Sequence, residues 1–368
     1  MVKGVKSTVK KQKHLVIAAA GTGGHVMPGL AVAREMQQRG WTVSWIGTQT
    51  GMERDLVQRQ GIDFDSLDFT GIRGKGVVHA LKGTLKLIRS AGASVEILEH
   101  RAASAVFSTG GYVAVPAAWA AKRRALPLVL MNCDADPLLS VKAVMPWAQK
   151  VMCGFEGTCA QVAAQKAVVC GNPVREEILA LPEPEQRLAN RTGALRIFVF
   201  GGSLGARILN ETLPKTLALM PEGSRPEIIH QVGRGNEQKV KQAYEELGVQ
   251  AQVHEFIHDM HSCYEWADLV ISRSGATSVS ELCAAGMASI LVPFVVSTTS
   301  HQLGNARYMS ENGASYMFEQ SHFNAQALQK LLAELTREKI LSMSQKARAL
   351  ARHDAAKTVA DTLEALSR

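Results

Sequence analysis

Three glycine-rich segments, each between an apolar run and a helical pattern, have the composition of turns that bind anionic ligands. They are Gly21-Thr-Gly-Gly-His25, Gly110-Gly-Tyr112 and Gly201-Gly-Ser-Leu-Gly-Ala206. Glycine has no Cβ to keep a phosphate or a sugar at a distance, and the following helix N-terminus offers unpaired N–H groups and a favourable dipole. A tight turn without a ligand would explain each segment alone. Three such turns together predict a site for a phosphate-bearing ligand.

The first turn does not complete the dinucleotide-binding fingerprint. That fingerprint needs G-x-G-x-x-G, and the position of its third glycine is occupied by Val26. An NAD-dependent oxidoreductase is therefore disfavoured.

A fourth segment, from Ser272 to Glu281, reads Ser-Arg-Ser-Gly-Ala-Thr-Ser-Val-Ser-Glu and has room for a diphosphate. Gly275 permits a sharp turn, and a helix is expected from Ser280 to Gly286, with Glu281 in its first turn. The Glu281 carboxylate could accept hydrogen bonds from both hydroxyls of a ribose. The alternative is an acid that only favours the helix dipole. Ser203 could likewise cap the helix that follows the third turn, or donate to a phosphate.

The elements that must position these turns are strands and helices in alternation, the pattern of a parallel sheet. In the first half, strands are expected at His14–Ala20, Trp41–Ile46, Ala105–Thr109, Pro127–Met131 and Lys150–Phe155, and helices at Leu30–Arg39 and Pro116–Arg124. In the second half, strands are expected at Arg196–Phe200, Glu227–Val232, Gln252–Phe256, Leu269–Ser272 and Ser289–Pro293, with a helix at Ala206–Met220.

The alternation stops and restarts around a polar, turn-rich segment at residues 172–194, where we place a domain boundary. We expect an α/β protein of two Rossmann-like parallel-sheet domains that face a cleft. Its expected parts are a basic tail at residues 1–13, an N-terminal domain at 14–175, a C-terminal domain at 190–345, and a helix at 346–368 that could pack back on the N-terminal domain.

Composition limits the kinds of partner. The chain has 368 residues, 46% of them hydrophobic and 20% charged, which excludes a disordered chain. A net charge of +8 favours nucleotides, nucleic acid or an anionic lipid surface. The six cysteines match no zinc spacing, and the most apolar stretch, Leu269–Val296, is interrupted by Arg273 and Glu281. With no secretory signal evident, we expect a cytoplasmic protein with reduced thiols.

Taken together, these segments resemble the MurG family, whose members transfer N-acetylglucosamine from a UDP-sugar to lipid I and form lipid II. The resemblance spans nearly the whole chain. The matching runs are Gly21–Ala31, Gly71–Gly76, Gly110–Val113, Gly171–Arg175, Gly201–Ala206, Phe256–Ile257, Arg273–Ala276 through Glu281, and His301-Gln-x-x-Asn-Ala306. The resemblance implies the GT-B fold, with the donor held mainly by the second domain and with no cofactor and no obligatory metal. It implies UDP-N-acetylglucosamine, lipid I and a membrane surface as partners, and no nucleic acid.

The resemblance also implies roles for individual residues. The donor-contacting residues would be Arg175 and Ser203 near the diphosphate and nucleotide, Ile257 at the uracil through its backbone, Ala276, Thr277, Ser278, Val279, Ser280 and Glu281 around the diphosphate and ribose, and Gln302 at the sugar hydroxyls. Thr22, Gly23 and Gly24 would lie across the cleft, near the donor sugar and the acceptor diphosphate.

The implied reaction is an inverting displacement in which the acceptor's C4 hydroxyl attacks the anomeric carbon and UDP leaves. His25 is the expected base, since an ordinary histidine pKa of about 6.5 suits proton acceptance at neutral pH. The alternative is a histidine that only anchors the loop. Helix N-termini and Ser203 would meet the charge on the leaving diphosphate.

The sequence departs from the family at three places. Ala20 replaces a glycine, Met131-Asn-Cys-Asp134 replaces His-Glu-Gln-Asn, and Ser297–Ser300 replaces the acidic residues often found before His301. Asp134 is expected near the donor sugar, where it could share or take over the role of the base.

A basic segment, Gly71–Ser94, contains no acid and predicts contact with a membrane. Its residues Val78, Leu81, Leu85 and Ile88 share one helical face, flanked by Lys82, Lys86 and Arg89, and Trp119 could join the same patch. The alternative is a core-facing helix with a solvated basic face. With an acceptor in the cytoplasmic leaflet, we expect a peripheral protein on the cytoplasmic face of the inner membrane.

Other functions remain open at this point. A UDP-sugar epimerase or a GT-B transferase with another acceptor would share the donor motifs. A UDP-sugar-binding module that lost turnover through the changes at Met131–Asp134 would bind the donor alone. A nucleic-acid binder would explain the charge but not the glycine turns.

Overall fold

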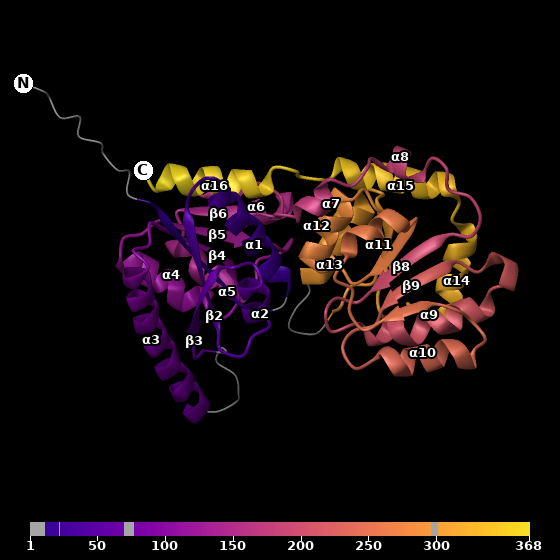
Figure 1. Ribbon diagram of the computed structural model, residues 1–368, viewed down its shortest axis with the longest axis horizontal. Helices are drawn as coiled ribbons and strands as arrows, with labels where there is room; N and C mark the ends of the chain where they lie inside the picture. Colours follow the sequence, from indigo (N-terminus) through magenta and orange to yellow (C-terminus); the bar gives the residue numbers. More distant parts are fainter. Residues whose placement is uncertain (1–11, 22, 70–76, 296–300) are drawn as a thin grey trace, which may run out of the picture.

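The computed structural model describes the backbone of residues 12–21, 23–69, 77–295 and 301–368, and the side chains of these residues except 77–82. Two parallel sheets lie side by side along the long axis of the molecule, each with helices around it (Figure 1). The two-domain α/β architecture expected from the sequence is therefore confirmed.

The N-terminal domain is built on a 7-stranded sheet with the order β3-β2-β1-β4-β5-β6-β7, in which all pairs are parallel. Its elements are β1 (His14–Ala19), α1 (Gly23–Gln38), β2 (Thr42–Thr48), α2 (Glu53–Gln58), β3 (Asp63–Leu67), α3 (Val77–His100), β4 (Ala105–Gly110), α4 (Ala114–Arg123), β5 (Leu128–Asn132), α5 (Leu139–Val144), β6 (Lys150–Cys153), α6 (Glu156–Cys159) and β7 (Ala167–Val169). The central strands β1, β4 and β5 are almost wholly buried because helices cover both faces.

The C-terminal domain is built on a 6-stranded parallel sheet with the order β10-β9-β8-β11-β12-β13. The linker helices α7 (Glu176–Leu179) and α8 (Pro184–Leu188) lead into β8 (Arg196–Phe200), α9 (Arg207–Leu219), β9 (Glu227–Gln231), α10 (Glu237–Glu246), β10 (Gln252–His254), α11 (Met260–Trp266), β11 (Leu269–Ser272), α12 (Ala276–Ala284), β12 (Ser289–Leu291), α13 (His301–Glu311), β13 (Ser315–Met317), α14 (Ala325–Glu334), α15 (Arg337–Ala349) and α16 (Ala355–Leu366).

Sequence patterning missed three strands, β3, β7 and β13, and all three lie at sheet edges. An edge strand has only one neighbour and is only partly covered, so its residues need not be apolar. β3 reads Asp-Phe-Asp-Ser-Leu, with three polar residues among five, while β7 and β13 have only 3 residues each. These strands lack the continuous apolar run by which the buried strands were found.

The chain crosses between the domains twice. After α15 it returns over residues 350–354, and α16 lies against the N-terminal domain (Figure 1). Arg39, the residue directly after α1, holds α16 through Asp361 at 2.6 Å and Glu364 at 3.1 Å. The two crossings tie the domains together.

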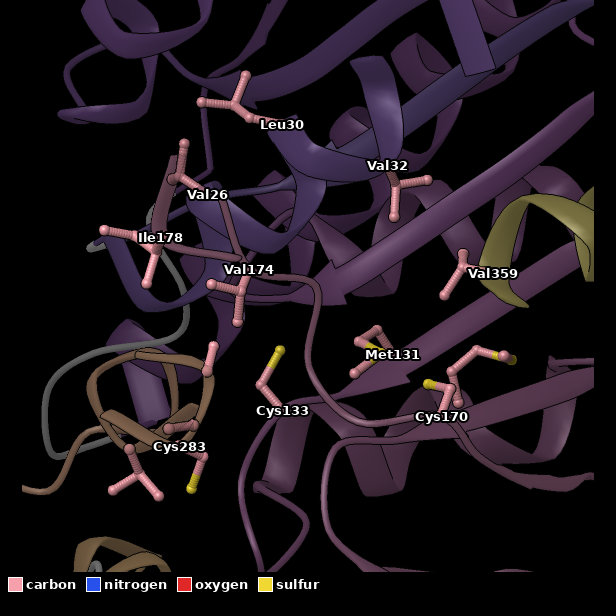
Figure 2. Close-up of a cluster of buried hydrophobic side chains, with 14 of the residues drawn as sticks. Val26, Leu30, Val32, Met131, Cys133, Cys170, Val174, Ile178, Cys283 and Val359 are labelled. Atoms are coloured by element: carbon pink, nitrogen blue, oxygen red, sulfur yellow. The ribbon is translucent and has the colours of Figure 1, made fainter. Parts of the chain in front are cut away.

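Apolar packing continues across the junction of the domains. Figure 2 shows Val174 and Ile178, from the first crossing, between Val26 of α1 and Cys283 of α12. All four are buried members of one core cluster that includes residues of both sheets. The junction therefore fixes where the first turn of α1 lies relative to α12.

Candidate functional site

A cavity of about 1390 Å³ opens between the domains, at the carboxyl ends of β1, β8 and β11. Ligands of open parallel sheets bind at this edge, because the strand–helix turns gather there. The turn of residues 200–206 and the start of α12 line the cavity on one side, and Gly23 and Gly24 line it on the other.

Three helix N-termini border this cavity, those of α1, α9 and α12. The first N–H groups of a helix have no partner within the helix, and its dipole is positive at that end. The Thr277 hydroxyl donates to the Gly24 carbonyl oxygen at 3.2 Å, so α12 and α1 meet across the domain junction. The arrangement suits an anionic group such as a diphosphate.

Two glycines of the turns are required by contacts between loops. Gly111 has φ +83°, and a Cβ there would lie 2.1 Å from the Ala20 carbonyl oxygen. Gly205 has φ +74°, and a Cβ there would lie 2.0 Å from the Val232 carbonyl oxygen. For these two positions, a close approach of backbone to backbone is sufficient reason for glycine.

Ser203 lines the cavity but does not cap α9. The N-cap of that helix is Ala206, which makes no side-chain cap bond. The capping role considered for Ser203 is therefore wrong, since α9 begins too late for the hydroxyl to reach its first turn. The Ser203 hydroxyl remains beside the cavity.

Glu281 lies in the second turn of α12, not in the first, because the helix already begins at Ala276. A stabilising contact with the helix dipole therefore does not explain it. Its carboxylate is buried, and burial raises its pKa, while the Arg175 guanidinium and the hydrogen bonds to the carboxylate act in the opposite direction. Oε1 accepts from Arg175 Nε at 3.0 Å and forms an ion pair with Nη2 at 2.8 Å, and Oε2 accepts from the Tyr264 hydroxyl at 3.2 Å.

Ile257 and Gln302 are both held by neighbouring loops at the cavity wall. The Ile257 N–H donates to Gln231 Oε1 at 2.9 Å, so this amide is already paired. Gln302 Oε1 accepts from the Phe294 N–H at 2.9 Å. This bond fixes the orientation of the carboxamide and leaves the Nε2 group of Gln302 as a donor for a ligand hydroxyl.

His25 lies in the first turn of α1, half-buried between Gly21 and Gly110. Its Nδ1 is 2.9 Å from the Thr109 carbonyl oxygen, and the Thr109 hydroxyl donates back to the His25 carbonyl oxygen at 2.7 Å. Because a carbonyl can only accept, Nδ1 carries the proton, and the neutral ring presents Nε2 as an acceptor. Burial lowers the pKa of His25, although the Asp134 carboxylate and the Thr109 carbonyl oppose this shift. The neutral form is therefore favoured near pH 7.

Asp134 follows β5 and joins the two domains. Its Oδ1 accepts from Asn305 Nδ2 of α13 at 2.9 Å. The same Nδ2 donates to the Ser274 carbonyl oxygen at 3.1 Å, and Asn305 Oδ1 accepts from the Ala135 N–H at 2.8 Å. Asn305 is fully buried, so its side chain is a paired polar bridge between the loop near His25 and the Ser272–Glu281 turn.

Comparison with known proteins identifies the family of this chain. Residues 15–153 match the glycosyltransferase family 28 N-terminal domain, and residues 196–361 match the glycosyltransferase family 28 C-terminal domain. A protein of Methylibium petroleiphilum, the UDP-N-acetylglucosamine–N-acetylmuramyl-(pentapeptide) pyrophosphoryl-undecaprenol N-acetylglucosamine transferase, is 51% identical over 97% of this chain and 98% of its own length. The crystal structure of Acinetobacter baumannii MurG matches with a TM-score of 0.80 at 31% identity, over 96% of this chain and 99% of that one.

The chain belongs to the MurG family. The resemblance proposed from its motifs is thereby confirmed. The UDP-GlcNAc 2-epimerase of Neisseria meningitidis also aligns, with a TM-score of 0.67 over 96% of this chain and 100% of that one, but its 13% identity shows only a shared fold.

The structure places most of the MurG-motif residues at the cavity. Those that line it are Gly23, Gly24, Arg175, Ser203, Ile257, Ala276, Thr277, Ser278, Glu281 and Gln302. His25 and Asp134 lie beside it, near the junction of the domains. Val279 packs in the core, and the Ser280 hydroxyl pairs with Asn172 Nδ2 at 2.9 Å, so neither side chain faces the cavity. Thr22 lies outside the described residues.

Three residues to which the sequence assigned no individual role contribute to the MurG-family site. Arg273 donates to the Val292 carbonyl oxygen at 2.9 Å and to Gln320 at 2.7 Å, which braces the loop that follows β12. Tyr264 and Asn305 hold Glu281 and Asp134. Arg273 and Asn305 both lay within motifs, Arg273–Ala276 and His301–Ala306, whereas nothing in the sequence around Tyr264 indicated its role.

Residues 77–94 of the expected membrane segment belong to the long helix α3, which packs against α4, and residues 71–76 lie outside the described residues. Leu85 is 49% exposed and Ile88 is 63% exposed, so these two side chains do not turn into the core. Lys86 pairs with Asp68 at 3.1 Å, and Arg123 lies over the ring of the half-exposed Trp119. The side chains of Val78, Leu81 and Lys82 lie outside the described residues.

Across the described residues, no helix is both long and apolar enough to span a membrane, and no three metal-binding side chains gather at one place.

Proposed function

We infer that the protein transfers N-acetylglucosamine from UDP-N-acetylglucosamine to the C4 hydroxyl of the N-acetylmuramyl sugar of lipid I, forming lipid II for peptidoglycan synthesis. Membership of the MurG family is one support. The observation that carries the proposal is the convergence of three helix N-termini from two domains on one cavity, with a fixed histidine beside it. Such a cavity suits a diphosphate-linked donor and a second substrate.

The donor is proposed to bind mainly against the C-terminal domain. Its diphosphate would lie over the N-termini of α9 and α12, next to Ser203 and Ser278. Glu281 would accept from the ribose hydroxyls, Ile257 would meet the uracil, and Gln302 Nε2 would donate to a sugar hydroxyl. The helix dipoles favour the negative charge that develops on the diphosphate as UDP leaves.

His25 is proposed as the base that removes the proton from the acceptor hydroxyl. The Thr109 carbonyl oxygen fixes the tautomer in which Nε2 is free to accept that proton. As the proton arrives, the ring becomes positive, and the Asp134 carboxylate favours this charged form. Oδ1 of Asp134 already accepts a hydrogen bond from Asn305, which supports a positioning role for Asp134 rather than the role of the base.

The test of this function is the release of UDP from UDP-N-acetylglucosamine, with and without a lipid I analogue, together with mass analysis of the lipid product. We expect UDP release that depends on the acceptor and a product heavier by one N-acetylglucosamine. Acceptor-independent turnover would indicate an epimerase or a hydrolase. Donor binding without turnover in either mixture would indicate a binding module.

The acceptor is membrane-anchored, and we propose that α3 and α4 dock the protein on an anionic membrane surface, at the cytoplasmic face of the inner membrane. Exposed Leu85 and Ile88 lie beside exposed Lys86 and Arg89 on α3, and half-exposed Trp119 lies on the adjoining α4. Apolar side chains that enter the lipid interface, bordered by cations that attract anionic headgroups, are the combination such binding needs.

Changing Lys82, Lys86 and Arg89 together to glutamine is expected to weaken binding to vesicles containing anionic lipid by about 150-fold, since three charges at about 1 kcal/mol each contribute about 3 kcal/mol. Vesicle co-sedimentation measures this effect. The matched control changes Lys215, Lys239 and Lys330, which are exposed on the C-terminal domain, and removes the same charge. Equal losses in the two triple variants would contradict docking through α3 and point to net charge alone.

A further inference from the structure

Tyr264 of α11 is a fully buried tyrosine whose hydroxyl contacts the carboxylate at the cavity wall. The hydroxyl lies 3.2 Å from Glu281 Oε2. The ring packs edge-on against Phe198, with centroids 5.9 Å apart, and against Phe200 at 6.3 Å. The ring is thus fixed by β8, and its hydroxyl has a single orientation relative to Glu281.

The two oxygens of Glu281 are held by different parts of the molecule. Oε1 is held by Arg175, which comes from the crossing between the domains. Oε2 is held by Tyr264, which belongs to the same domain as Glu281. Helix α7, which begins directly after Arg175, packs against α11 and α12, so both donors reach Glu281 from elements in contact with α12. Tyr264 is the donor that holds Oε2.

An ionised carboxylate has about four lone-pair sites, so one bond to each oxygen leaves room for further donors. Glu281 lines the cavity, and the two adjacent hydroxyls of a ribose require both oxygens in a fixed plane. A buried carboxylate that lost a donor would favour its neutral form, which accepts more weakly than the ionised form.

We propose that Tyr264 is a positioning residue for ribose recognition: its hydroxyl holds Glu281 in the orientation that accepts from the 2′- and 3′-hydroxyls and thereby sets the preference for a ribonucleotide donor over a 2′-deoxyribonucleotide donor. The inference rests on the proposed function, because it takes the uridine nucleotide of the donor as the ligand of this cavity.

The test compares the affinities of the full-length protein for UDP and for 2′-deoxy-UDP, measured by calorimetry. The wild type is expected to prefer UDP by about 10-fold or more, the value of one hydrogen bond to a charged group. Tyr264→Phe keeps the ring and its packing on Phe198 and Phe200. It is expected to weaken UDP binding by about 3- to 10-fold and 2′-deoxy-UDP binding less, so that the ratio falls.

The matched control is Tyr244→Phe on α10. Tyr244 is also buried in the C-terminal domain, and its hydroxyl pairs with His230 Nδ1 at 3.0 Å, away from the cavity. This variant also removes one buried tyrosine hydroxyl, and thermal melts compare its loss of stability with that of Tyr264→Phe. The ratio of the affinities for UDP and 2′-deoxy-UDP should stay unchanged. A third variant, Glu281→Gln, should abolish the preference, and adding Tyr264→Phe to it should change the ratio no further.

The outcomes separate the two proposals. A wild type that prefers UDP, with the same preference in Tyr264→Phe, would overturn the role of Tyr264 and leave the donor site standing. A wild type that binds neither nucleotide would instead overturn the donor site, and with it the proposed function. An equal fall of the ratio in Tyr244→Phe would show a general loosening of the domain and would also overturn the inference.

Discussion

His25→Ala is expected to lower kcat by about 10²- to 10⁴-fold, the contribution of a positioned general base, while the affinity for UDP changes little. The Nε2 atom is the acceptor that the fixed tautomer leaves free, whereas the donor-binding turns belong mainly to the other domain. Single-turnover transfer to a lipid I analogue and calorimetric titration with UDP measure the two quantities separately.

A second substitution distinguishes a base from a loop anchor. His25→Asn keeps an N–H close to the position of Nδ1, which can still donate to the Thr109 carbonyl oxygen, but it has no basic nitrogen. If His25 is the base, both variants are equally slow. Activity near wild type in His25→Asn would show that the bond to Thr109 is the whole contribution of this side chain.

The pH profile follows from the same geometry. Burial lowers the pKa of His25, so the proton leaves the ring below the usual range of histidine. The base is active when neutral, and kcat is therefore expected to rise as pH increases through that lowered pKa and to be level near pH 7. A rise that persists above neutral pH would contradict the assignment.

Asn305→Ala is expected to lower the free energy of unfolding by about 3 kcal/mol, and transfer activity with it. The Asn305 carboxamide now makes hydrogen bonds to the Ala135 N–H, the Ser274 carbonyl and the Asp134 carboxylate, and the change leaves all three without this partner. Each buried unpaired group costs about 1–3 kcal/mol. Because these groups lie in both domains, the loss should also loosen the contact between the loop near His25 and the donor-binding turn. Denaturant unfolding and the KM for the donor measure the two effects.

Two controls accompany this variant. Asn312→Ala removes an exposed amide just beyond the same helix and should change stability by less than about 0.5 kcal/mol. Asp134→Asn keeps an oxygen that accepts from Asn305, so stability should persist. Transfer should slow less than in His25→Ala, because only the charge that favours the protonated ring is lost. An Asn305→Ala protein as stable as Asn312→Ala would contradict the bridge, and an inactive, folded Asp134→Asn would move the role of base from His25 to Asp134.

The sequence alone determined the alternation of elements and the positions of the turns. Strands such as His14–Ala19 are buried on both faces, and their continuous apolar residues are a local property that can be read along the chain. The glycine-rich turns that follow these strands could also be recognised from residue type along the chain. The edge strands Asp63–Leu67 and Ser315–Met317 had none, because their pairing depends on a neighbour supplied by the fold.

Only the tertiary structure decided how the site is held together. Glu281 meets Arg175 across 106 positions of the chain, and Asp134 meets Asn305 across 171. The sequence proposed Arg175, Glu281 and Asp134 as separate contacts of a ligand, but the fold pairs them with protein groups before any ligand arrives. The sequence indicated no role for Tyr264 for the same reason, since its hydroxyl meets Glu281 only when β8, α11 and α12 pack side by side. Residue type and spacing reveal which groups are available, whereas burial and packing decide which of them are paired, charged or free.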